Sequence, residues 1–380
     1  MNAKILHGKT TGRRRYNQVV TGKKSVVVPL VAMWLMVGCV ANPAQDDLST
    51  SGENFANACG ERPDNQVLSP LVVAHSSSLV TEPYLAWGIK NNCFAKQGLD
   101  VSLISSGNNL FDKIAALTGG TADVGIDSTL EITLALLESN VSIVTLNAGG
   151  YSYTLNELES ARVPELEQGR LKLQTVLLLQ PDISYSEIND LSGLSIGISG
   201  LANPNTLGLL RALEGKGINS SSLNFVELSS ADRMAAFDRR DLDGVLVNGY
   251  SALERIRGGA QLVLYPGAFF YEEAPVNVYY TTDEIAARKE GLLKAFERGI
   301  SETNTELNKS GNHDSFKDFL QSHYGVGVEE IEQFVMPVMW TSEIIPRHFE
   351  YTIPHLARAS LVGPEKSTVD SLVFLSERLP

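Results

Sequence analysis

Residues 81–128, TEPYLAWGIKNNCFAKQGLDVSLISSGNNLFDKIAALTGGTADVGIDS, carry the local signals that decide the fold class. The first part is typical of a helix. The hydroxyl of Thr81 can accept a hydrogen bond from an early backbone N–H, and Pro83 has no N–H to lose in the first turn. We predict that this helix runs to about Phe94 and ends before Gly98, because glycine readily adopts the left-handed conformation of a helix end.

Two short strands and a second helix follow in the same stretch. Residues 99–104 alternate between apolar and polar side chains, as a half-buried strand does, and apolar residues recur at helical spacing over residues 110–117. Gly119-Gly120 ends that helix, and residues 122–126 form a short apolar strand before the polar pair Asp127-Ser128. Helices between short apolar strands require crossover connections, so the pattern predicts a mainly parallel sheet.

Three motifs carry a family resemblance. The first is FAKQGLDV at residues 94–101, the second is GGTADVG at residues 119–125, and the third is DLSGLSIGI at residues 190–198. Together they resemble the substrate-binding proteins of nitrate/sulfonate/taurine-type ABC importers, a group with relatives that bind the pyrimidine precursor of thiamine. The resemblance extends roughly from Leu71 to the C-terminus. It implies an α/β fold of the periplasmic binding protein-like type II, with two Rossmann-like lobes and two crossover segments.

A partial internal repeat supports two similar lobes. Each copy has two alanines and a large apolar residue, an aspartate after five further residues, and a polar residue at the end of the next strand. The matching residues are Ala115-Ala116-Leu117, Asp123 and Ser128 in the first copy, and Ala235-Ala236-Phe237, Asp243 and Asn248 in the second. The predicted organisation is a signal peptide at 1–38, a lipidated tether at 39–65, a first lobe from 66–151 and 276–380, and a second lobe from 152–275.

The N-terminal residues differ in charge from the rest of the chain. Residues 1–38 contain seven basic residues and no acidic one, so their removal leaves 24 of the 31 basic residues against all 44 acidic ones. The remaining net charge near −20 disfavours nucleic-acid binding, which needs clustered Lys and Arg. An apolar run at residues 26–37 is too short to span a bilayer comfortably and is typical of a signal peptide.

The end of this apolar run, Leu35 to Cys39, resembles a bacterial lipoprotein box, which implies that Cys39 is lipidated after cleavage. An ordinary signal peptide with an incidental cysteine is the alternative. The other two cysteines, Cys59 and Cys93, form either a disulfide, which an oxidising compartment permits, or two unpaired thiols. No Cys–His spacing resembles a zinc site, and we expect no metal and no cofactor.

Candidate ligand-binding residues follow from the predicted sheet. Ligands of open parallel sheets bind beyond the carboxyl ends of the strands, where loops lead into helices. Those ends are rich in hydroxyl, amide and glycine groups, which suit hydrogen bonding to a small polar ligand, and helix N-termini favour anionic groups. The candidates are His75, Ser76, Ser77, Tyr84, Asn108, Asp127, Ser128, Gly149, Ser199, Asn203, Asn205 and Asn248.

The charges of these segments bear on the ligand. They contain no Arg or Lys, and Asp127 is their only ionised group unless His75 is protonated. We therefore expect a zwitterionic or neutral nitrogenous ligand rather than nitrate or sulfate, because charge-assisted anion binding commonly uses Arg. Two alternatives remain open at this point: Asp127 caps a helix that starts near Thr129, and Tyr84 and Trp87 pack in the core instead of stacking on a planar ligand.

Catalytic motifs are missing from the sequence. It has no G-x-S-x-G elbow, P-loop, H-E-x-x-H or dinucleotide fingerprint. The Cys-rich motif of the enzyme that makes the thiamine pyrimidine is also missing. We therefore expect no enzymatic activity. The resemblance to the ABC-importer proteins implies a monomeric extracytoplasmic substrate-binding lipoprotein that closes its two lobes on a sulfonate/taurine-like or nitrogenous ligand, for example a pyrimidine. It would deliver this ligand to an ABC permease and its ATPase. The alternatives are a ligand-sensing lipoprotein with a membrane signalling partner, and a receptor for nitrate or bicarbonate.

Overall fold

The computed structural model describes residues 57–62, 66–76, 81–107, 110–138, 142–152, 171–172, 174–271, 274–331, 334–363 and 373–374. The predicted signal peptide, the predicted lipidation site Cys39, residues 39–56 and 63–65 of the predicted tether, and the candidates Ser77 and Asn108 lie outside these residues. In the part of the chain that is described, no helix combines the length and the apolar character needed to cross a bilayer.

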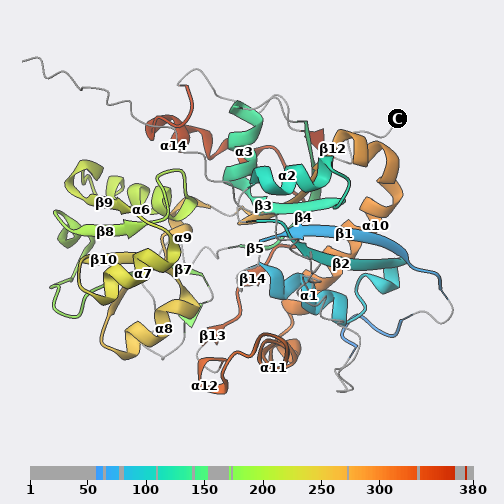
Figure 1. Cartoon of the computed structure of the whole chain (residues 1–380), viewed down its shortest axis with the longest axis horizontal. Helices are drawn as coiled ribbons and strands as arrows, with labels where there is room; N and C mark the ends of the chain where they lie inside the picture. Colours follow the sequence, from blue (N-terminus) through green and yellow to red (C-terminus); the bar gives the residue numbers. More distant parts are fainter. Residues whose placement is uncertain are drawn as a thin grey trace, which may run out of the picture. The chain divides into compact units, whose positions relative to one another are not determined.

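The first lobe is built on a six-stranded sheet (Figure 1). Its strands, in order across the sheet, are β15 (Val373–Phe374), β4 (Ile143–Gly149), β12 (Asn277–Thr282), β3 (Val124–Ser128), β1 (Ser69–His75) and β2 (Leu99–Ser105). The predicted parallel pairing holds for β1 with β2 and with β3, but β12 runs antiparallel to both β3 and β4. The reason is that β12 returns from the second lobe and starts at Asn277, opposite the last residue of β3, Ser128.

The second lobe repeats this arrangement in a five-stranded sheet. Its strands, in order, are β11 (Gln261–Leu264), β7 (Thr175–Leu179), β10 (Gly244–Asn248), β8 (Ser195–Ile198) and β9 (Asn224–Glu227). Here β7 is antiparallel to its neighbours β10 and β11, as β12 is in the first sheet. Its first residue, Thr175, lies opposite Asn248, the last residue of β10. The internal repeat of the sequence therefore corresponds to two sheets of matching strand order.

Helices cover both faces of each sheet. In the first lobe, α1 (Glu82–Lys90) and α10 (Asp283–Leu307) pack on one face, and α2 (Leu110–Thr118) and α3 (Thr129–Glu138) pack on the other (Figure 1). In the second lobe, α7 (Ser230–Asp238) and α8 (Gly249–Arg257) pack opposite α6 (Pro204–Glu214). The remaining described helices are η1 (Ala95–Gln97), η2 (Ile188–Leu191), η3 (Ser220–Ser222), α9 (Gly267–Phe270), η4 (Ser310–Asn312), α11 (His313–Tyr324), α12 (Val328–Ile331), α13 (Arg347–Glu350) and α14 (Ile353–Arg358).

Short strand pairs accompany the passages of the chain between the sheets. The strand β5 (Tyr151–Ser152) pairs with β14 (Val338–Met339), and β6 (Leu171–Lys172) pairs with β13 (Phe334–Val335). Ser152 also bridges to Pro275, just before β12 begins. The outgoing and the returning crossover segments are thus hydrogen-bonded to each other, and the C-terminal segment runs along the outgoing one.

The repeated aspartates have the same structural role in both lobes. The backbone N–H of Val72 in β1 donates to Oδ2 of Asp123 at 3.1 Å, and the N–H of Asp123 donates to the Val72 carbonyl at 2.8 Å. In the second lobe, Ser195 of β8 and Asp243 make the corresponding pair of bonds at 2.8 and 3.0 Å. Each aspartate therefore fixes the start of one central strand beside its neighbour, which explains why the sequence repeats it.

The end of the first helix differs from the prediction. The helix α1 ends at Lys90 instead of near Phe94, because Asn92 adopts the left-handed conformation with φ 64°. The left-handed conformation predicted for Gly98 is present, with φ 82°, but it ends the short helix η1. The side chain of Thr81, predicted to cap α1, makes no capping hydrogen bond.

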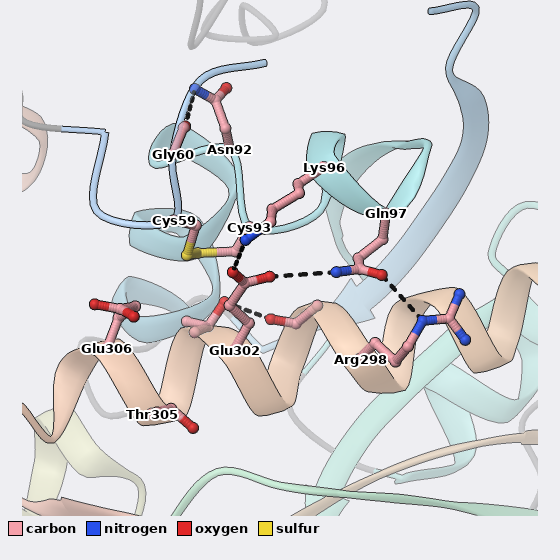
Figure 2. A network of polar contacts seen from close by, with 12 residues as sticks. Cys59, Gly60, Asn92, Cys93, Lys96, Gln97, Arg298, Glu302, Thr305 and Glu306 are labelled. Atoms are coloured by element: carbon pink, nitrogen blue, oxygen red, sulfur yellow. Dashed lines mark hydrogen bonds and ion pairs between the residues drawn. A yellow bond between two sulfur atoms is a disulfide. The ribbon is translucent and has the colours of Figure 1, made fainter. Parts of the chain in front are cut away.

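A disulfide joins Cys59 to Cys93 just after this helix (Figure 2). Both cysteines are buried in the first lobe, so this part of the predicted tether is attached to the folded body. Beside the disulfide, Glu302 of α10 accepts from Lys96 at 2.5 Å and from Gln97 at 3.2 Å (Figure 2). These contacts fasten the segment after α1 to the longest helix of the structure.

Candidate functional site

A cavity of about 790 Å³ is lined by residues of both lobes at the carboxyl ends of β3, β8 and β10. These are the strand ends at which ligands of this sheet type bind. Seven of the predicted ligand-binding residues line it: Ser76, Asp127, Ser128, Ser199, Asn203, Asn205 and Asn248. The structure therefore brings these seven residues together at one cavity, the candidate ligand site, although several individual roles differ from the predictions.

On the first lobe, the helix cap is Ser128 and not Asp127. The hydroxyl oxygen of Ser128 accepts from the backbone N–H of Glu131 at 3.2 Å. The Glu131 carboxylate in turn accepts from the backbone N–H of Ser128 at 3.3 Å and from its hydroxyl at 2.8 Å. This reciprocal pair is a capping box at the start of α3. The alternative that Asp127 caps this helix is wrong because the strand β3 continues through Ser128, two residues beyond the predicted strand end at residue 126.

Asp127 is held by two buried partners. Its Oδ1 accepts from Nζ of Lys113 at 2.8 Å, and its Oδ2 accepts from the hydroxyl of Tyr280 at 2.8 Å. Lys113 comes from α2 and its side chain is fully buried. The strand-end segments contain no Arg or Lys, but Lys113, which lies outside them, pairs with Asp127.

This environment shifts the acidities of the cluster. Burial, and then the nearby Glu131 carboxylate, raise the pKa of Asp127 to about 6, while Lys113 and the Tyr280 hydrogen bond act in the opposite direction. The pKa of Tyr280 is raised above its usual range, first by burial and then by the Asp127 carboxylate beside it. The Tyr280 hydroxyl is therefore a permanent donor to Asp127 at physiological pH.

On the second lobe, two asparagines cap the helices that point at the cavity. The side-chain oxygen of Asn203 accepts from the N–H of Asn205 at the start of α6, and that of Asn248 accepts from the N–H of Ser251 at the start of α8, both at 2.9 Å. Each side chain keeps its NH₂ group as a donor. The second wall thus combines helix N-termini with amide donors.

Arg233 was not among the predicted residues, yet it lines this cavity. It lies in α7 and is only 8% exposed. Its Nη1 donates to the carbonyl of Leu228 at 3.1 Å, whereas its buried Nε has no partner among the described residues. Burial lowers the pKa of Arg233, the direction expected of a cation removed from water. The sequence did contain a pattern that sets Arg233 apart, because the internal repeat aligns this residue with Lys113 of the first lobe.

Three other candidates do not line the cavity. His75 is buried beside it, with Nδ1 at 3.3 Å from a carboxylate oxygen of Glu82. Tyr84 stacks on Phe316 with ring centroids 5.2 Å apart, and Trp87 is fully buried, so both belong to the core. Gly149 lies in β4, where its carbonyl accepts from the side chain of Asn304 at 2.7 Å. None of these residues lines the cavity.

The polar groups that line the cavity suit a small polar organic molecule. It contains hydroxyls, amides, helix N-termini and Arg233, together with the carboxylates of Asp127, Glu131 and Glu227. Within the described ranges, no group of three or more His, Cys, Asp or Glu side chains could hold a metal ion.

Comparisons with known proteins bear on the fold. No protein-family model and no curated protein matches the sequence. Among solved structures, the aliphatic sulphonate-binding protein SsuA from Escherichia coli matches with a TM-score of 0.60 at 13% identity, covering 82% of this chain and 97% of that one. The alkanesulfonate-binding protein SsuA from Xanthomonas axonopodis pv. citri, bound to MOPS, matches with a TM-score of 0.59 at 11% identity, covering 83% and 100%.

A Candida albicans gene product, described as exhibiting the generic periplasmic binding protein structural fold, gives a TM-score of 0.59 at 13% identity over 80% of this chain and 96% of that one. The three likenesses are too distant in sequence to transfer a ligand, because one fold hosts many functions. With the two sheets of matching strand order, they show that this chain has the α/β fold of the periplasmic binding proteins.

Proposed function

We propose that this protein is the extracytoplasmic substrate-binding component of an ABC importer, which closes two lobes on a small organic ligand. The observation that carries the proposal is the cavity of about 790 Å³, lined at strand carboxyl ends by both lobes. A ligand held from two sides binds the closed state better than the open one, and this differential affinity is what drives closure.

The short strand pairs between the sheets provide a place for the hinge. The segments around Ser152 and Pro275 are bridged to each other, and β5 and β6 are paired with the C-terminal segment. Hinges of this kind absorb their rotation in a few residues at the ends of elements. The protein would bind and release its ligand chemically unchanged and present it to a permease and its ATPase.

The proposed location is the outer side of a membrane, with the mature chain anchored through acylated Cys39. The disulfide between Cys59 and Cys93 supports an oxidising compartment. Mass spectrometry of the mature N-terminus tests the anchor. An acylated Cys39 is expected, and an unmodified terminus beyond residue 39 would refute it.

Ligand binding is tested by a thermal-shift screen of the mature protein against sulfonates, amines, pyrimidines, nitrate and bicarbonate. A ligand present at about a hundred times its Kd should add about 2.7 kcal/mol to the free energy of unfolding. Small-angle X-ray scattering with and without that ligand should show a smaller radius of gyration in the bound state. Turnover of the bound compound, or an unchanged radius at saturation, would contradict the proposal.

A further inference from the structure

The internal repeat places two buried cations at matching positions of the two lobes. Lys113 is the fourth residue of α2 and Arg233 is the fourth residue of α7. They are separated by the same 120 residues that separate the repeated aspartates Asp123 and Asp243. Both side chains are more than nine-tenths buried. The two lobes can therefore be compared residue by residue around these cations.

The two cations differ in the anion that faces them. Lys113 has the carboxylate of Asp127 at 2.8 Å. The residue that matches Asp127 in the second lobe is Val247, which is buried and also lines the cavity. The second lobe therefore has a valine where the first has the carboxylate that neutralises its lysine.

The tyrosine of the first lobe is replaced as well. Tyr280, which donates to Asp127, lies opposite Gly125 on the neighbouring strand. In the second lobe, Leu178 lies opposite Val245, the residue that matches Gly125. A polar cluster of lysine, aspartate and tyrosine has thus become an arginine beside two apolar side chains.

Among the described residues, Arg233 consequently has no anionic partner. Over the described residues, no carboxylate lies within ion-pair distance of its guanidinium, and its hydrogen bond goes to the neutral carbonyl of Leu228. An arginine stays charged at physiological pH, and a buried charge without a counter-charge costs free energy. Because Arg233 lines the cavity, a molecule in the cavity can supply the missing counter-charge.

We propose that Arg233 is the anchor for an anionic group of the ligand, a carboxylate, a sulfonate or a comparable oxyanion, which the second lobe binds. This inference rests on the proposed function and specifies the substrate class of the same site. The planar guanidinium has five N–H donors in a fixed fork, a geometry that matches oxyanions. The helix N-termini capped by Asn203 and Asn248 add partial positive charge to the same wall.

The other charges of the cavity restrict the rest of the ligand. Glu131 on the first lobe and Glu227 on the second also line the cavity, whereas Asp127 is already paired with Lys113. These carboxylates repel a compact anion with several charges. The ligand class is therefore an organic molecule with one anionic end, which binds at Arg233, and a neutral or cationic remainder. This narrows the expected ligands, which were zwitterionic, sulfonate-like or neutral, to those that carry an anionic group.

The test compares probes and variants by calorimetry on the mature protein. The probes are taurine, ethanesulfonate and propionate, with ethanolamine and cytosine as counterparts that lack an anionic group. The variant is Arg233→Met. The control is Arg239→Met, which removes an exposed arginine directly after the end of α7. We expect an anionic probe to lose about 10- to 100-fold in affinity in Arg233→Met, the scale of a hydrogen bond to a charged group. The control should bind as the wild type does.

A second pair of variants rebuilds the first lobe's cluster in the second. Val247→Asp places a carboxylate where Asp127 stands in the first lobe, and Val247→Asn adds a polar group of similar size without the charge. Val247→Asp should pair with Arg233 and reduce anion affinity at least tenfold more than Val247→Asn does. Equal losses in both variants would overturn the inference. This comparison does not depend on deleting Arg233 itself.

Each pattern of results separates the inference from the proposed function. If an anionic probe binds wild type and Arg233→Met equally, or if only neutral or cationic probes bind, the Arg233 anchor is wrong and the receptor function stands. If no probe of any charge class binds the wild type, both proposals fail. Loss of anion binding in Arg233→Met and Val247→Asp, with retention in both controls, supports the anchor.

Discussion

Replacing Tyr280 with phenylalanine tests the buried cluster behind the cavity. The change removes one hydroxyl, which donates to Asp127 at 2.8 Å, and it leaves the ring in place. A hydrogen bond to an ionised group contributes about 1.5–3 kcal/mol, and one to a neutral group about 0.5–1.5 kcal/mol. Asp127 has a pKa of about 6 in the folded protein, so its carboxyl group is charged at neutral pH and protonated in mild acid. The cost of Tyr280→Phe should therefore depend on pH.

Urea unfolding at about pH 7.5 and about pH 4.5 measures this dependence. We expect Tyr280→Phe to lower the free energy of unfolding by about 2 kcal/mol at the higher pH and by about 1 kcal/mol at the lower one. The matched control is Tyr279→Phe on the neighbouring residue of β12, a buried tyrosine that makes no hydrogen bond with the described residues through its hydroxyl. Its cost should be small and the same at both pH values.

Two outcomes would refute this reasoning about the cluster. A loss for Tyr280→Phe of the same size at both pH values would show that Asp127 does not change its charge in this range. A loss below about 0.5 kcal/mol at the higher pH would show that the hydroxyl does not hold the carboxylate, because that is less than the contribution of a neutral hydrogen bond.

Three further predictions concern the same lobes. The folded-state pKa of Asp127 lies above its unfolded value of 3.8, so ionising this group destabilises the fold. Relative to Asp127→Asn, the wild type should lose roughly 3 kcal/mol of unfolding free energy as the pH rises from 3.8 to about 6, and none above that pH. If the unfolding free energies of the two proteins, measured in urea, change with pH in the same way, this prediction is wrong. The double replacement of Cys59 and Cys93 by alanine opens a loop with a sequence separation of 34, and it should lower the free energy of unfolding by about 4 kcal/mol in urea without a reducing agent. A loss below about 1 kcal/mol would mean that the disulfide does not restrict the unfolded chain. Asn248→Ala removes the cap of α8 and should cost about 1 kcal/mol in thermal unfolding, with Asn248→Gly recovering most of it; a larger loss in glycine than in alanine would argue against the cap.

Much of the fold could be predicted because its signals are local. Apolar alternation in residues 99–104 and helical spacing in residues 110–117 predicted β2 and α2 closely. The aspartates Asp123 and Asp243 were also visible as a repeat, although each acts through a strand that is distant in the chain, at Val72 or at Ser195. The location of the site followed from the same patterns, because parallel strands bring their carboxyl ends to one edge of a sheet.

The errors arose where a residue's role depends on a distant partner. The end of α1 depends on the turn at Asn92, beside the disulfide that joins Cys93 to a segment 34 residues earlier. Whether Asp127 capped a helix or formed an ion pair could not be decided from its neighbours in the chain, because both roles suit a carboxylate at a strand end.

The charge of the site was decided by tertiary structure alone. Lys113 and Arg233 lie within helices, away from the strand ends where ligands were expected, and only packing against the sheets brings Lys113 to Asp127 and Arg233 to the cavity. The sequence contained their equivalence as a spacing of 120 residues. It did not contain the difference between them, which depends on Asp127 and Val247 lying across from them on another element. Local pattern determined two similar lobes, and long-range pairing neutralised Lys113 in the first lobe and left Arg233 of the second lobe facing the cavity.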